Sequence, residues 1–331
     1  MTSHQSKTGL ALIVLTLLTG CSPEPDSQST PSPTDNSAAT AQIQNPGAPE
    51  LDQIVNATFS GLYQHPITLT DGRWEGEPYA AGGASRPSVG LIPDSYLIGD
   101  LDGDDAAEAV VMLWQSSGGS GVFSHLATFV WRNGEIVNTG VAPIGDRVQV
   151  RSARIDDEQI ILDVIQQGPG DAACCPSQKA TRHWSLSKDT LIEGQAQLEG
   201  QLTLADIDEK EWQLVQLDRN GPLPESVQVT LQIYGDRLAG QGPCNRYFAG
   251  VEAGNGPGEI KIGQSGTTRM ACPDPLMPLE QKYLKLLAGV NRYGFMMGKL
   301  ALSWQSERKH GTMLFTLGNQ ATKSNDADNS N

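Results

Sequence analysis

The sequence predicts a mainly β N-terminal domain followed by an α+β C-terminal domain in which antiparallel strands pack on one helix. Two observations support this prediction. Short runs of alternating apolar and polar residues, separated by turn residues, recur from about residue 51 to residue 317. One segment alone has a convincing helical repeat. The chain has 331 residues, which is long enough for two ordinary domains.

The region from 51 to 200 contains two segments that are typical of β-hairpins. Apolar runs at 126–131 and 136–137 flank Asn133-Gly134, and this dipeptide between apolar runs is the strongest short-range hairpin signal. Alternating runs at 148–155 and 159–165 are separated by three acidic residues. This region is therefore predicted to be a mainly antiparallel β domain of unknown function.

A second domain is expected over residues 203–317. Strand-like runs occur at 212–217, 227–234, 300–304 and 312–317. Between them, apolar residues at 279, 283, 286, 287 and 290 share one face at helical spacing. Pro278 suits an early helical position, and Gly294 is predicted to end the helix.

The N-terminus has the pattern of an export signal. Lys7 precedes an apolar stretch at 10–18, and Leu18-Thr19-Gly20-Cys21 follows. This pattern resembles the lipobox of bacterial lipoproteins, which implies a signal peptide at 1–20, a diacylglycerol on the Cys21 thiol and acylation (for example by palmitate) of the freed amine. The apolar stretch is shorter than the roughly 20 residues that a membrane-spanning helix needs.

The segments that flank the predicted domains are polar. Residues 21–50 are rich in Pro, Ser and Thr and contain no aromatic residue, so we expect the lipidated cysteine to be followed by a disordered tether. The tail at 318–331 has no large apolar residue and is expected to be disordered.

The charge and the leader together indicate the cellular setting. The formal net charge is −15, which disfavours nucleic acid as a partner. We expect the lipid anchor to bind a membrane and an envelope protein to be a possible partner. Ser22 after the lipidated cysteine is not the aspartate associated with inner-membrane retention, so the expected location is the outer membrane, facing the periplasm.

Several motifs in the second domain resemble the META domain of HslJ-type heat-inducible proteins. They are Trp212-Gln-Leu, the Gly240 to Gly250 segment with Cys-Asn-Arg, Thr268-Arg-Met-Ala-Cys272 and Leu279-Glu-Gln-Lys-Tyr283. The resemblance covers about residues 203–317. It implies a small β-rich domain with one helix, found in bacterial envelope proteins, some of which are linked to heat or drug tolerance. The motif residues include Asn245, Arg246 and Met270, of which Asn245 and Arg246 are expected to fix a turn rather than to contact a ligand.

Four cysteines remain after the predicted lipidation site, and an exported protein meets an oxidising compartment. Cys244 and Cys272 lie in the two most distinctive META motifs, so they are predicted either to form a disulfide or to be two buried thiols. Cys174 and Cys175 are adjacent in a loop rich in Gly and Pro. They are predicted to be a vicinal disulfide or a redox pair, or alternatively buried or separately oxidised thiols.

An acidic loop is the one candidate metal site. Asp100, Asp102 and Asp104 alternate around Gly103, and Glu108 follows four residues later. Oxygen ligands at this spacing converge on one cation when the backbone curls, so the loop predicts calcium binding. The alternative is a solvated Asp-Gly turn between strands.

The sequence contains none of the usual catalytic motifs, such as a zinc-binding helix, a nucleophile elbow or a phosphate loop. We therefore expect a non-catalytic envelope lipoprotein that serves in binding or in envelope maintenance under stress, with no cofactor other than possible calcium. The alternative is a ligand-binding or hydrolytic protein that acts on a cell-envelope or drug-like substrate.

Overall fold

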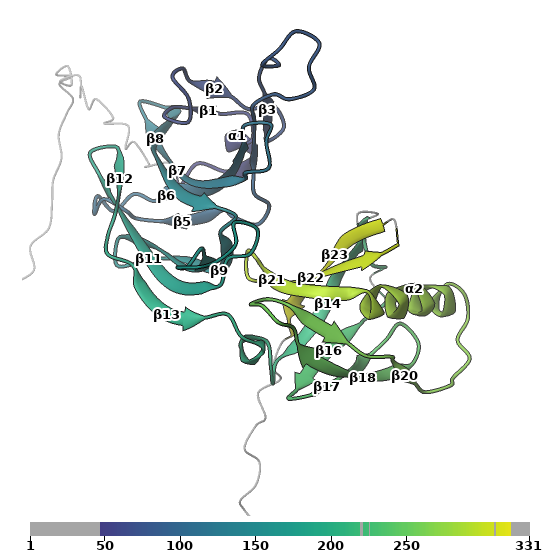
Figure 1. Cartoon of the computed structure of the whole chain (residues 1–331). Helices are drawn as coiled ribbons and strands as arrows, with labels where there is room; N and C mark the ends of the chain where they lie inside the picture. The colour runs from purple at the N-terminus through teal and green to yellow at the C-terminus, as the bar shows by residue number, and fades with distance from the viewer. Residues whose placement is uncertain (1–46, 219–220, 225, 308, 319–331) are drawn as a thin grey trace, which may run out of the picture. The chain divides into compact units, whose positions relative to one another are not determined.

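The structure is a computed structural model that describes residues 47–218, 221–224, 226–307 and 309–318. The expected signal peptide, Cys21, nearly all of the expected tether and the expected tail from residue 319 lie outside the described residues. Within the described part, strands predominate and every strand pair is antiparallel (Figure 1). No helix in this part is long and apolar enough to cross a membrane.

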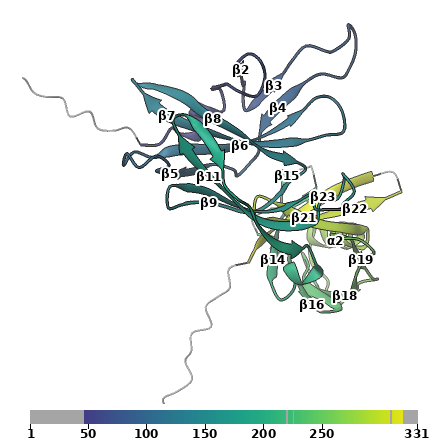
Figure 2. The same cartoon turned by 60° about the vertical axis from the view of Figure 1, so that its left-hand side comes forward.

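The first large sheet has six strands, with β5 pairing β6 beside the path β3-β4-β6-β7-β8 (Figure 2). The strands are β3 (Arg73–Glu75), β4 (Ser88–Leu91), β5 (Leu97–Gly99), β6 (Glu108–Ser116), β7 (Phe123–Arg132) and β8 (Glu135–Asp146). The predicted hairpin at Asn133-Gly134 is present, and both residues have positive φ, 55° and 81°. Positive φ at both central residues is the condition for a tight two-residue hairpin turn, which these residue types favour.

The second sheet has five strands, β9 (Gln149–Asp156), β10 (Gln159–Gln166), β11 (Gln178–Ser187), β12 (Thr190–Glu193) and β13 (Gln197–Gln201). The predicted acidic turn joins β9 to β10. Asp157 and Glu158 both have positive φ, 50° and 58°, so this hairpin also turns on two residues.

Buried side chains connect these two sheets and cover the far face of the first. One apolar cluster combines Val110 and Leu126 of the first sheet with Ile160 and Trp184 of the second. Another cluster packs the opposite face of the first sheet against a short hairpin and a one-turn helix. These elements are α1 (Leu51–Ile54), β1 (Thr58–Phe59) and β2 (Ile67–Thr68). Each face of the first sheet is therefore buried.

The C-terminal region forms a third sheet of ten strands that nearly closes on itself. Its path is β19-β18-β17-β16-β14-β23-β22-β21, and β15 and β20 pair beside it. The strands are β14 (Glu211–Asp218), β15 (Gly221–Pro222), β16 (Thr230–Tyr234), β17 (Arg237–Gln241), β18 (Arg246–Ala253), β19 (Ile260–Ile262), β20 (Gly266–Thr267), β21 (Val290–Met296), β22 (Lys299–Ser306) and β23 (Lys309–Leu317). An isolated bridge between Glu259 and Arg292 brings the two ends of the path together.

The long helix α2 (Leu276–Ala288) is preceded by the single-turn η1 (Leu204–Asp206) and strands β14 to β20 in the chain. Pro278 lies in its first turn, as predicted. The predicted end at Gly294 is wrong, because Gly289 follows the last helical residue and its N–H caps the carbonyls of Leu286 and Leu287. Val290 begins β21, and Gly294 lies inside that strand.

The described chain is thus mainly β. The prediction of antiparallel strands packed on one helix did not include this near closure, in which the strands curve until the two ends of the sheet meet at the bridge between Glu259 and Arg292. Register shifts interrupt β14 near Leu214 and β21 near Val290, and such irregularities bend strands and increase their twist. Tyr283 and Leu287 of α2 join the same buried cluster as the strand residues.

Candidate functional site

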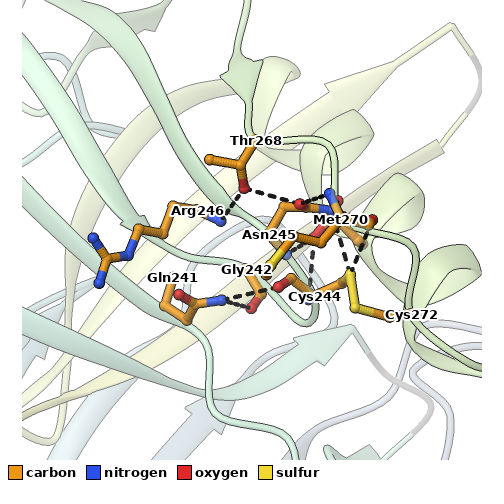
Figure 3. Close-up of a disulfide and its surroundings, with 9 residues drawn as sticks. Gln241, Gly242, Cys244, Asn245, Arg246, Thr268, Met270 and Cys272 are labelled. Carbon is orange, nitrogen blue, oxygen red and sulfur yellow. Dashed lines mark hydrogen bonds between the residues drawn. A yellow bond between two sulfur atoms is a disulfide. The ribbon is translucent and has the colours of Figure 1, made fainter.

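A disulfide joins the two most distinctive motifs of the C-terminal region. Cys244, which is 5% exposed and lies just before β18, is bonded to Cys272, which lies just before α2 (Figure 3). The bond fixes the turn at 242–245 to the segment at 268–272. The two cysteines are 28 residues apart in the sequence. By restricting the unfolded chain, the bond stabilises the folded state by about 3–4 kcal/mol.

A buried carboxylate from α2 holds the same turn from the other side. Glu280 is 5% exposed, and its Oε2 accepts hydrogen bonds from the backbone N–H groups of Cys244 and Asn245. Its Oε1 accepts a third from the side-chain amide of Asn245, at 2.9 Å. Three N–H donors satisfy this carboxylate, and a buried charge needs such partners to be tolerated.

The amide of Asn245 connects the turn to the neighbouring segment. Its Oδ1 accepts hydrogen bonds from the Thr268 hydroxyl and the Met270 N–H, both at 2.8 Å, as Figure 3 shows. Its Nδ2 also lies 3.3 Å from the Met270 carbonyl oxygen. Asn245 thereby uses its whole hydrogen-bonding capacity inside the protein, so its role is to position the backbone.

The three predicted motif residues lie near one another but differ in what they offer. The Arg246 N–H donates to the Thr268 hydroxyl at 3.2 Å, whereas the Arg246 side chain extends away from the disulfide (Figure 3). Met270 contributes backbone groups, and its side chain is exposed. Glu280 was missed as a site residue, although it shares the buried face of the predicted helix with Tyr283 and Leu287 at spacings of three and four. A charged residue at such a position is a usable signal.

Two tyrosines lie beneath this turn. The hydroxyls of Tyr247 and Tyr283 are 2.6 Å apart, and Tyr247 donates to the Thr230 carbonyl at 2.7 Å. Burial raises the pKa of both phenols well above the ordinary value, so both stay neutral at physiological pH. The pair links α2 to β16 and β18.

A groove of about 340 Å³ opens on the outer face of the third sheet, beside the turn. Its lining residues come from β14, β16, β17 and β18 and are Glu211, Thr230, Gln232, Tyr234, Ala239, Gly240, Gln241, Arg246 and Tyr247. Gly240 is required at its floor, because a Cβ there would lie 2.0 Å from the Thr230 carbonyl oxygen. The groove places one carboxylate and one guanidinium in the same concave surface.

Comparison with known proteins identifies this region. Residues 203–317 match the family model of the META domain. This part of the chain is a META domain. The chain is similar to a protein from Burkholderia xenovorans whose structure was solved by NMR. The two are 22% identical in sequence, the match covers 35% of this chain and 86% of the other, and the TM-score is 0.29. No curated protein matches the chain.

Outside the META domain, three acidic side chains of the predicted calcium loop converge. Carboxylate oxygens of Asp100, Asp102 and Glu108 lie within 4.8 Å of one another. Asp100 is already engaged, since it accepts backbone N–H groups of Asp102, Gly103 and Asp105. These bonds lower the pKa of Asp100, and the bond from Gly103 has the largest effect.

Asp104 does not belong to this trio, although the sequence prediction included it. Its Oδ1 accepts the N–H of Ala106 at 2.8 Å, two residues further along the chain. It lies close enough to the trio to act through its charge. Together with Asp100, it adds to the effect of burial in raising the pKa of Asp102.

Glu108 is the least solvated member of the trio. It is 3% exposed, and its Oε2 accepts one hydrogen bond, from the Leu101 N–H at 2.7 Å. Burial, together with the charges of the neighbouring aspartates, raises the pKa of Glu108 to about 7. A proton or a cation would each relieve the repulsion among these carboxylates.

Cys174 and Cys175 are bonded to each other in the loop between β10 and β11. Asp171 holds the base of this loop: its carboxylate accepts the N–H groups of Gly168 and Ser177 and the Ser177 hydroxyl, each at 2.8 Å. These bonds lower the pKa of Asp171, and the bond from Gly168 has the largest effect. The vicinal pair thus lies in a fastened loop, and its redox role stays a prediction.

Proposed function

We propose that this chain is a non-catalytic binding protein of the bacterial cell envelope and that its META domain carries the binding surface. The observation that supports binding is the groove on the outer face of the sheet, which lies beside a rigid turn. The turn is fastened by the Cys244–Cys272 disulfide and by Glu280, and Arg246 leads directly from it into the groove.

The motif residues suit positioning better than chemistry. Asn245 and Glu280 direct their polar atoms at each other and at neighbouring backbone groups. A catalytic acid or base needs a hydrogen-bonding group that reaches the substrate. A second candidate function, a ligand-binding or hydrolytic protein that acts on a cell-envelope or drug-like substrate, is favoured by the same groove, and its binding half is compatible with our proposal.

The proposed setting is the outer membrane, facing the periplasm, with the protein held by lipids on Cys21. The leader pattern and Ser22 after the cysteine support this placement, and the META family resemblance supports a role in envelope maintenance under stress. Acyl chains contribute about 0.8 kcal/mol per buried methylene, so several chains hold a protein on a membrane without a spanning helix.

Replacement of the lipidated cysteine tests this placement. We expect Cys21→Ser to move the protein from the membrane fraction to the soluble envelope fraction, measured by fractionation and immunoblotting. Ser22→Ala is the matched control and should leave the protein in the membrane fraction. A Cys21→Ser protein that stays in the membrane fraction would contradict the lipid anchor.

The binding role is tested by site-specific photocrosslinking in living cells. A photoreactive amino acid replaces Gln232 in the groove of the full chain, and the control replaces Lys261, an exposed residue of β19 outside the groove. We expect adducts at position 232 that are absent at position 261. Equal labelling at the two positions would contradict the proposal that the groove is the binding surface.

A further inference from the structure

The groove of the META domain has a regular layout that indicates the chemistry of its ligand. The strand register aligns Glu211 with Gln232, Gln232 with Ala239, and Ala239 with Phe248. These four residues form one row across β14, β16, β17 and β18. Three of them, Glu211, Gln232 and Ala239, line the groove. They span two strand spacings, about 10 Å, which exceeds one sugar ring or one amino-acid side chain.

Small residues make the middle of the row concave. Ala239 stands between Gln232 and Phe248, and Gly240 follows it on β17. The Phe248 ring leans over Gly266 of β20, where a Cβ would lie 2.4 Å from the ring. The ring therefore lies toward β20, and Phe248 is not among the residues that line the groove.

The side chains around this hollow have polar ends that are free to bind a ligand. Among the described residues, no hydrogen bond or ion pair engages the Glu211 carboxylate, the Gln232 amide or the Arg246 guanidinium. Arg246 lies two residues before Phe248 in β18 and opposite Gln241 in the register. Planar amide, carboxylate and guanidinium groups each form pairs of hydrogen bonds. Two adjacent hydroxyls on a sugar ring are spaced so that they can accept or donate both bonds of such a pair.

An aromatic side chain lies at one end of the hollow. Tyr234 lines the groove and is 52% exposed, although burial is the favourable state for a ring of this size. An aromatic ring with a polar tip suits a ligand that is apolar on one face and polar at its rim. A pyranose ring has this character, since its C–H groups gather on one face and its hydroxyls project around the edge.

The charges limit which saccharides fit. The groove carries one acidic and one basic side chain, Glu211 and Arg246, so it has no net charge of its own. The chain as a whole has a formal charge of −15, which repels polyanions. An uncharged glycan meets neither penalty.

We propose that this groove binds a short, uncharged oligosaccharide. One sugar ring lies against Tyr234, and hydroxyls of the oligosaccharide form hydrogen bonds with Gln232, Glu211 and Arg246. This inference rests on the proposed binding function and names its ligand class. An extended peptide is the competing ligand. Its backbone does not offer the pairs of adjacent hydroxyls that match the planar polar groups of the groove.

The test is titration of the purified full chain with chitotetraose, an uncharged oligomer of N-acetylated sugars, followed by calorimetry. Cellotetraose is the second probe, and tetra-alanine is the peptide probe. We expect one of the two saccharides to bind at submillimolar concentration and tetra-alanine not to bind. Arg246→Ala should weaken saccharide binding roughly tenfold, since it removes hydrogen bonds from a charged group.

A matched variant separates the site from general effects of charge. Arg269→Ala removes an exposed arginine of the same domain that does not line the groove, and it should bind like the unmodified chain. Circular dichroism checks that both variants are folded, and Gln232→Ala provides a second variant of the groove. Saccharide binding that is equal in all four proteins would place the site elsewhere and overturn the proposal.

The outcomes also distinguish this inference from the proposed function. If neither saccharide binds at millimolar concentration, the saccharide proposal is wrong. Photocrosslinks to a protein at position 232 would then preserve the binding function and identify a polypeptide as the ligand. If saccharides fail and positions 232 and 261 crosslink equally, both proposals are wrong.

Discussion

Two buried carboxylates in this molecule lie in opposite environments. Glu280 of the META domain is 5% exposed and accepts three N–H groups. Glu108 of the N-terminal region is 3% exposed, accepts one N–H from the backbone, and faces Asp100 and Asp102. Burial alone therefore does not decide the role of an acidic side chain. The donors around Glu280 make it a structural anchor, whereas Glu108 lacks such partners and is poised to take up a proton or a cation.

Loss of the anchor should have the largest effect. We expect Glu280→Ala to lower the free energy of unfolding by about 3 kcal/mol, because it leaves the N–H groups of Cys244 and Asn245 unpaired in the interior. Urea denaturation measures the change. Glu252→Ala, which removes an exposed acid from β18, should cost no more than about 0.5 kcal/mol. A similar loss of unfolding free energy in the two variants would show that Glu280 is not a structural anchor.

Calcium should have the next largest effect, and it should act through Glu108. A ligand that binds the folded state stabilises it by about 2.7 kcal/mol when its concentration is one hundred times its dissociation constant. We expect millimolar calcium to raise the melting temperature of the full chain. Glu280→Gln should keep this response, whereas Glu108→Gln should lose it. An unchanged melting temperature of the unmodified chain in calcium would exclude a calcium site at this loop.

The pH dependence of stability should depend on Glu108 as well. Its pKa of about 7 lies above the ordinary value of 4.5, so its contribution to stability is fully present below pH 4.5 and is lost as the pH rises through 7. Glu108→Gln should therefore melt about 2–4 °C higher than the unmodified chain at pH 8 without calcium. The difference should shrink at pH 5. Thermal melts at the two pH values test this, and an equal difference at both would contradict it.

Asp104 provides the smallest expected effect. Because it lies outside the trio of converging carboxylates, Asp104→Asn should reduce the calcium response much less than Asp102→Asn does. Calcium titrations that are followed by the melting temperature compare the two variants. A larger loss for Asp104→Asn would mean that the loop rearranges around the cation.

The sequence was most informative where structure depends on neighbouring residues. Asn133-Gly134 and the acidic turn at Asp157 both specify their hairpins, because a two-residue turn needs residues that tolerate positive φ. The predicted end of α2 lies too far along the chain because the apolar repeat continues past Gly289, the residue that caps the helix. The META motifs located the domain correctly.

The candidate site depends on contacts between distant residues, which a single sequence does not reveal. Glu280 meets Asn245 across 35 residues of chain. The groove exists because β14, β16, β17 and β18 align Glu211, Gln232 and Ala239 in one row, and that register depends on the pairing of whole strands. The acidic loop was located by its spacing, but which of its aspartates converge depends on the path of the backbone.

The nearly closed META sheet has a consequence for how the protein behaves in a crowded environment. A free strand edge presents unpaired N–H and C=O groups that invite pairing with another chain. Here the bridge between Glu259 and Arg292, and the hydrogen bond from the Tyr293 N–H to the Gly258 carbonyl, occupy groups at the two ends of the sheet. Closure thereby lessens the opportunity for edge-to-edge aggregation when many copies stand close together.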